Sequence, residues 1–278
     1  MPRPYGGGMS TNASSTVHST ASRLANSPVL RGLARAGYAV NGILHFIIGF
    51  IALGVAFGGG GEADQAGALG ELASKPGGQA LLWVMTIGLF GLGLFQLVIA
   101  ALVRGTDKDS WADRAKEGGK GVAYIAVGVT ALTFALGGSS DSSSQTQSIS
   151  AQLLKTPGGV VLLLVLAAAV IAIGVYFVVK GVKKKFVEDI TVPAGATGKA
   201  IIATGMAGYI AKGLAVAIVG VLFAVAAFQS DASEASGLDG ALTSLAELPF
   251  GQVILVLVAL GFVAYAAYCF LRARYAKL

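Results

Sequence analysis

Charged residues are scarce in this chain. Of its 278 residues only 12% are Asp, Glu, Lys or Arg, whereas 55% are hydrophobic and the mean hydropathy is +0.74. A soluble globular domain carries about 25% charged residues, roughly twice the density found here. A chain of this length with so little charge cannot cover a water-facing surface, which argues against a soluble enzyme.

The groups that build metal and redox sites are also nearly missing. Cys269 is the only cysteine, and His18 and His45 are the only histidines. One cysteine cannot form an intrachain disulfide or a thiolate zinc cluster, and only one of the two histidines lies in an apolar run. The chain also lacks the His-Glu-x-x-His and Gly-x-x-x-x-Gly-Lys-Ser/Thr motifs. We therefore expect no metal site, no cofactor and no enzymatic activity.

Long apolar runs dominate the remaining sequence. A helix needs about 20 apolar residues to cross the hydrocarbon core, because its backbone must satisfy its own hydrogen bonds there. Six windows meet this requirement: 36–57, 80–103, 121–137, 158–179, 206–228 and 251–271. The third window is the shortest. Residues 1–30 contain no apolar run, and we expect them to be a disordered cytoplasmic tail without a cleavable signal peptide.

The basic residues lie on one side of these windows. Nearly all of the 20 Lys and Arg fall in the tail, in the loops after the second and fourth windows, and at the C-terminus. The three opposite loops hold only Lys75 and Lys155 together with eight acids: Glu62, Asp64, Glu71, Asp141, Asp231, Glu234, Asp239 and Glu247. Basic loops stay in the cytoplasm, so we expect a multi-pass membrane protein with both termini cytoplasmic.

One two-helix unit occurs three times. In the first, third and fifth windows a polar residue precedes a glycine, and a second glycine follows seven residues later. These residues are Asn41-Gly42 with Gly49, Lys120-Gly121 with Gly128, and Lys212-Gly213 with Gly220. Glycines at this spacing share one helix face and let another helix approach closely, which is how helices associate in lipid. Each even window follows a short amphipathic stretch (68–73, 149–154 or 238–247), which we expect to be an interfacial helix, and then Pro76, Pro157 or Pro249.

The repeats predict the architecture. Each unit has two spans, so all three units enter the membrane in the same direction. We expect an all-α membrane protein of six transmembrane helices, built as three tandem helical hairpins (31–104, 114–185 and 200–277) in a pseudo-threefold arrangement around an axis along the membrane normal. Such an arrangement differs from the inverted repeats of many transporters.

The motifs resemble a known family. The pattern Arg35-x-Gly37-Tyr38, Gly42, His45 and Gly49, followed by Leu72-Ala73 and Pro76-x-Gly78, is similar to the bacterial integral membrane family catalogued as domain of unknown function 1206. The middle repeat departs from it, because it has Gly119-Lys120-Gly121 without the Gly-Tyr pair. The resemblance implies three such units and a plasma-membrane location, and it carries no activity or catalytic residue.

Polar residues inside the spans are the candidate ligand-binding residues, because burying them is costly. Asn41, Lys120 and Lys212 occupy equivalent positions and would converge near the axis, with His45 on the same face as Asn41. A cationic layer without acids suits an anion. The alternatives are that both lysines extend to the interface and that His45 is a hydrogen-bonded packing residue.

Two functions fit these features. The first is a structural or accessory membrane protein that binds anionic lipid of the cytoplasmic leaflet, or another membrane protein complex, with Lys183, Lys184 and Lys185 attracting lipid headgroups. The second is a small anion-selective transporter or channel with the polar layer as its constriction. Neither involves nucleic acid.

Overall fold

The computed structural model describes residues 28–103, 105 and 107–277, and this part of the chain is helical without a β-strand. Among the described residues, six helices are long and apolar enough to cross a membrane. They are α2 (Pro28–Ala56), α4 (Gly78–Leu102), α5 (Lys108–Ala135), α7 (Gly159–Val182), α8 (Ala196–Gln229) and α10 (Gly251–Tyr275). Three shorter helices and two 3-10 turns connect them: α3 (Gln65–Ala73), α6 (Ser142–Leu154), α9 (Gly237–Glu247), η1 (Lys185–Asp189) and η2 (Ala232–Glu234).

The long helices extend beyond the predicted windows. The third window, expected to be the shortest span, belongs to the 28-residue helix α5. The first half of α5, which begins after the N-cap residue Asp107, is polar, so a search for apolar residues does not include it. Residues 1–27 of the predicted tail lie outside the described residues, and α2 already begins at Pro28. The three amphipathic stretches form α3, α6 and α9 as expected.

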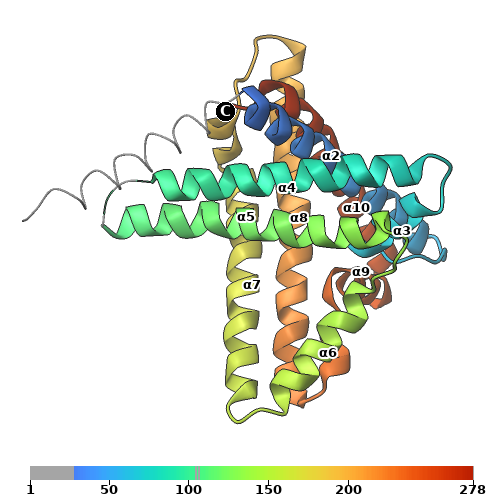
Figure 1. The fold of residues 1–278 in the computed structure, drawn as a ribbon. Coiled ribbons are helices and arrows are strands. Elements are labelled where there is room, and N and C mark those ends of the chain that lie inside the picture. The colour runs from blue at the N-terminus through green and yellow to red at the C-terminus, as the bar shows by residue number, and fades with distance from the viewer. Residues whose placement is uncertain (1–27, 104, 106, 278) are drawn as a thin grey trace, which may run out of the picture.

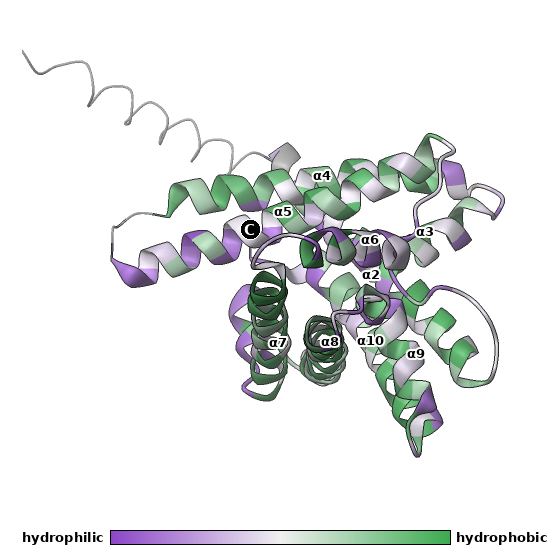
Figure 2. Cartoon of the chain, turned by 90° about the horizontal axis from the view of Figure 1, so that it is seen from below, coloured by the Kyte–Doolittle hydropathy of each residue, from purple (hydrophilic) through white to green (hydrophobic). Residues whose placement is uncertain are grey.

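The closest helix pairs join different repeats. The first helix of each repeat packs along the second helix of the preceding one, which gives the pairs α5 with α4, α8 with α7 and, closing the ring, α2 with α10. The same relation therefore occurs three times, as a pseudo-threefold arrangement of three tandem hairpins requires. The pairs differ in direction, since α4 and α5 run across α7 and α8 (Figure 1), and α7 and α8 are seen end-on where α4 and α5 lie lengthwise (Figure 2).

This difference in direction bears on the expected axis. If the pseudo-threefold axis lies along the membrane normal, each helix pair must be tilted from that normal. The helices contain 24 to 34 residues, whereas about 20 suffice for a perpendicular crossing, so they are longer than an untilted span requires.

The repeated glycines lie at these three pairs. A Cβ atom on Gly49 would lie 2.9 Å from the Ala259 carbonyl oxygen of α10, and one on Gly213 would lie 2.6 Å from that of Gly174 in α7. Gly128 also faces the partner helix of its pair, with a Cβ at an ordinary distance of 3.5 Å, whereas Gly42, Gly121 and Gly220 approach theirs almost as closely as Gly49 and Gly213 do. Contact this close leaves room for no side chain, so the small residues set the distance between the helices.

Contacts within a repeat are less uniform. Gly37 lies against Gly88 between α2 and α4, and Gly208 lies against Tyr265 between α8 and α10. The middle repeat has Lys116 at the position of Gly37 and Gly208, and α5 and α7 barely touch in the described part of the chain. A long charged side chain cannot enter such a seam, so the missing Gly-Tyr pair coincides with an opening of the ring.

The short helices α3, α6 and α9 lie on one side of the molecule (Figure 1), which we call the acidic end because the acidic loops are there. The basic loops follow the other ends of the long helices, which we call the basic end. The Ala63 amide donates to Asp239 (2.8 Å), and Ser143 donates to the Ser236 carbonyl oxygen (2.8 Å). These bonds connect all three acidic loops, since they join the loop before α3 to α9 and α6 to the turn before α9.

The second helix of each repeat (α4, α7 or α10) is preceded by a residue whose backbone lies in the left-handed region of φ and ψ. Gly77 (φ 79°) and Gly158 (φ 77°) occupy this position after the repeated proline, and Phe250 (φ 62°) replaces them in the third repeat. A glycine adopts such a φ without a steric cost. Phe250 has the same backbone conformation at the equivalent position, directly after Pro249.

Candidate functional site

Three of the four predicted polar-layer residues meet in the interior. His45 lies one turn after Asn41 on α2, and its Nδ1 atom is 2.8 Å from the Asn41 carbonyl oxygen. Its Nε2 atom lies 3.0 Å from Lys212 Nζ of α8. The Asn41 amide reaches Cys269 Sγ of α10 at 3.4 Å. The layer therefore joins α2, α8 and α10.

The geometry assigns the protons of this layer. A carbonyl oxygen only accepts hydrogen bonds, so Nδ1 of His45 carries the proton and Nε2 accepts from the Lys212 amino group. Aromatic rings surround that amino group, with the Tyr265 ring at 4.6 Å and the Phe177 ring at 5.7 Å. His45 is thus a hydrogen-bonded residue of the packed interior as well as a neighbour of the buried lysine.

Lys120 does not join this layer. Its Nζ atom lies 2.7 Å from Glu117 Oε1, one turn earlier on α5, and the side chain lines a separate cavity at the basic end. Glu117 occupies the position of Tyr38 and Tyr209 in the other repeats. The expectation that three equivalent polar residues converge is therefore wrong for Lys120, because the middle repeat supplies a carboxylate partner nearby.

The cavity beside Lys120 has a volume of about 210 Å³, and its lining combines polar with apolar side chains. Its polar lining is Tyr38, Gln96, Glu117, Lys120, Asp189, Arg272 and Lys277. Asp189 Oδ2 pairs with Lys180 Nζ (2.7 Å) and Arg272 Nη2 (3.6 Å). Burial acts to raise the pKa of Asp189, but Arg272 and Lys180 outweigh it and hold that pKa below its ordinary value.

The Asp189 cluster was missed in the sequence although a signal exists. Lys180 and Arg272 each follow the repeated proline by the same interval, so they are equivalent residues of the second and third repeats. Their shared partner, Asp189, lies in η1, outside the repeated pattern. Phe186 anchors η1 because it is fully buried and stacks on Tyr209 at 5.5 Å.

The interior next to the polar layer is filled with side chains. Leu44 and Ile48 of α2 and Phe262 of α10 are almost entirely buried, and the Tyr265 ring lies 4.7 Å from that of His45. Large apolar and aromatic groups therefore occupy the space that a conduction path past Lys212 would require.

A groove of about 590 Å³ lies on the surface between α2 and α10 at the basic end. Two exposed arginines, Arg35 and Arg274, line it together with Phe270 and Tyr275. Lys183, Lys184 and Lys185 are exposed at the same end, where α7 meets η1. The groove combines two guanidinium groups with aromatic surface, which suits a phosphate attached to an apolar chain.

Comparisons with known proteins agree with the three repeats. The chain is 29% identical to the uncharacterized protein YxxB of Bacillus subtilis (strain 168) over 256 residues, which cover 89% of this chain and 92% of YxxB. No solved structure matches the chain. The model of the family described as Domain of Unknown Function (DUF1206) matches three consecutive regions, residues 36–102, 117–184 and 207–276. This chain therefore belongs to the DUF1206 family and contains three tandem copies of its unit.

Proposed function

We propose that this protein is a non-enzymatic accessory protein of the bacterial plasma membrane that binds an anionic phospholipid at its basic end. The observation that carries the proposal is the groove between α2 and α10, in which Arg35 and Arg274 flank Phe270. A guanidinium group forms paired hydrogen bonds with phosphate oxygens. The exposed Phe270 ring offers an apolar surface to the attached chain.

The distribution of charge supports this proposal and the orientation that it needs. Basic residues near the ends of membrane helices favour the cytoplasmic side, and anionic lipids of that leaflet attract them by about 1 kcal/mol per charge. Lys183, Lys184 and Lys185 would raise the local concentration of such lipids around the groove. A lipid held between α2 and α10 would also join the first and last repeats, and a partner membrane complex could bind the same end.

Anion transport has less support. The polar layer that would select the anion contains one lysine rather than two, and aromatic and aliphatic side chains pack around it. Glu117 and Asp189 neutralise part of the basic cavity at the end of the axis.

The groove is tested with the double variant Arg35→Gln/Arg274→Gln. Native mass spectrometry of the protein in mild detergent, titrated with phosphatidylglycerol, measures the affinity of each variant. We expect a loss of about thirtyfold, since two charges contribute roughly 2 kcal/mol. The control Lys184→Gln/Lys185→Gln removes the same charge from the same end and should lose clearly less.

Two results would contradict this proposal. Wild-type affinity in the groove variant would remove the groove as the binding site. Loss of the lipid in Lys212→Met, with binding retained in the groove variant, would instead place the anion at the interior polar layer.

A further inference from the structure

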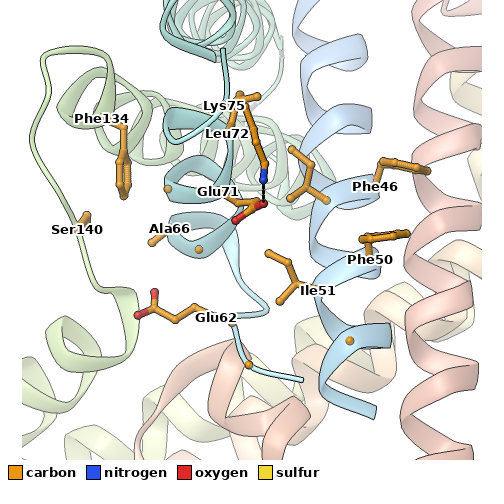
Figure 3. Close-up of a pocket in the computed structure, with 16 residues that line it drawn as sticks. Phe46, Phe50, Ile51, Glu62, Ala66, Glu71, Leu72, Lys75, Phe134 and Ser140 are labelled. Atoms are coloured by element: carbon orange, nitrogen blue, oxygen red, sulfur yellow. Dashed lines mark ion pairs between the residues drawn. The ribbon is translucent and has the colours of Figure 1, made fainter. Parts of the chain in front are cut away.

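A second groove lies at the acidic end, and the basic-end proposal does not use it. It has a volume of about 750 Å³ and lies between α2, α3 and the end of α5 (Figure 3). Its walls and its rim differ in chemistry.

The walls of this groove are apolar. Ile47 and Ile51 of α2 face Leu72 of α3, and Phe134 closes the side toward α5. Phe46 and Phe50 continue the apolar surface outward along α2, with 48% and 68% of their surface exposed and their ring centroids 6.5 Å apart. An exposed aromatic strip beside an apolar groove provides contact for a hydrocarbon chain that enters from the bilayer.

The rim of the groove is charged with an excess of acid. Glu71 pairs with Lys75 at 2.8 Å, and Figure 3 shows this pair facing α2 with Glu62 at the other end of the groove. Partial burial raises the pKa of Glu62, and the nearby Asp141, Asp64 and Asp239 raise it further. Two carboxylates and one ammonium group therefore leave one negative charge at the rim.

The groove also contains open space beside two of its glycines, Gly54 and Gly60. A Cβ atom on Gly54 or Gly60 would meet no atom within 4 Å. Gly54 lies in α2 with an ordinary helical φ, so a larger residue there would occupy the groove without straining the backbone.

From these features we infer that the acidic-end groove binds a phospholipid with a primary-amine headgroup, such as phosphatidylethanolamine. One acyl chain lies along Ile47, Ile51 and Phe134, the ammonium group binds Glu71, the phosphate group lies near Lys75, and Glu62 adds to the negative charge of the rim. The zwitterionic headgroup matches a rim that carries both signs of charge with an excess of acid. A choline headgroup has no N–H to donate to the carboxylates.

The headgroup preference is tested first, with the wild-type chain. Native mass spectrometry in mild detergent compares phosphatidylethanolamine with phosphatidylcholine of the same acyl chains. We expect about tenfold tighter binding of the ethanolamine lipid, the ratio that one charge-assisted hydrogen bond supports. The double variant Glu62→Gln/Glu71→Gln should reduce this preference to about none. Equal affinity of the wild type for both lipids would overturn the inference.

The position of the acyl chain is tested with a filled groove. Gly54→Leu should abolish most of the binding of phosphatidylethanolamine, because the leucine side chain occupies the open space. Gly32→Leu is the matched control, since Gly32 lies on the same helix near the basic end and a Cβ there also meets no atom within 4 Å. It should bind as the wild type does.

Other occupants would be recognised in the same experiment. Unchanged binding in Gly54→Leu would overturn the inference. A loss of dimers in Gly54→Leu, without a change in lipid binding, would assign the groove to a second copy of this chain. Phosphatidylglycerol binding at the basic end is measured separately and is expected to be unchanged in Gly54→Leu, so the two proposals can fail independently.

Discussion

Asp189 holds two cations of different helices at the basic end. Lys180 lies in the last turn of α7 and Arg272 in the last turn of α10. Both approach the same carboxylate oxygen. The Lys180 side chain is only 7% exposed, so its charge has little access to water. A single carboxylate in η1 thus compensates two buried charges and ties the second repeat to the third.

Removing this carboxylate should destabilise the protein. Asp189→Asn leaves Lys180 and Arg272 without their counter-ion, and we expect a loss of roughly 1–3 kcal/mol. Because the folded-state pKa of Asp189 is lowered, its contribution is present above its unfolded pKa of about 3.9 and is lost as the pH falls through the lower folded value. The apparent midpoint of thermal unfolding in detergent, measured between neutral pH and pH 3, should therefore fall less with acid in Asp189→Asn than in the wild type. A parallel fall in both proteins would show that Asp189 makes no such contribution.

The interior polar layer shows which contacts of single residues can be predicted from the sequence. The spacing of Asn41 and His45 places them on one helix face, and they do interact. The contact of His45 with Lys212 joins residues 167 positions apart. The repeat predicted that Lys212 approaches this face of the first helix, but no pattern in the sequence indicates this particular pair of atoms.

At the scale of helices, six repeated glycines are equivalent in sequence but unequal in their surroundings. A Cβ on Gly213 would lie 2.6 Å from the Gly174 carbonyl oxygen, whereas one on Gly128 would lie 3.5 Å from Leu89, an ordinary contact. The periodicity indicates which face packs. How closely it packs depends on the partner helix, which the spacing within one helix does not specify.

The pair Gly213→Ala and Gly128→Ala should separate these cases. The first forces α7 and α8 apart and should cost about 1–3 kcal/mol, as over-packing does. The second meets no clash and gains helix propensity worth up to about 1 kcal/mol, so its stability should be unchanged or higher. Thermal unfolding in detergent measures both variants. Equal destabilisation of the two would mean that the α4–α5 pair is as tight as the α7–α8 pair.

At the scale of the whole molecule, the three repeats form a ring that is open at one seam. The first and last repeats meet through α2 and α10, and the opening lies within the middle repeat, between α5 and α7. The absent Gly-Tyr pair in that repeat signals a difference, but its consequence became clear only from the way the other two repeats use Gly37 and Gly208.

The proposed orientation places the acidic end outside the cell and the basic end in the cytoplasm. Cysteines introduced as Lys155→Cys and Lys183→Cys test it, since both positions are exposed and lie at opposite ends, while the native Cys269 is buried. On intact cells a membrane-impermeant maleimide should label Lys155→Cys at once and Lys183→Cys only after lysis. The reverse pattern would invert the orientation.

The sequence by itself determined the six spans, the threefold repetition of a two-helix unit and the glycine-bearing faces, because hydropathy and periodicity are properties of consecutive residues. Only the tertiary structure decided that the closest pairs join neighbouring repeats, that Asp189 pairs with both Lys180 and Arg272, and that grooves open at both ends. These features depend on which faces of separate helices meet. In this chain the helix faces that meet are those where glycines lie against the backbone of another helix.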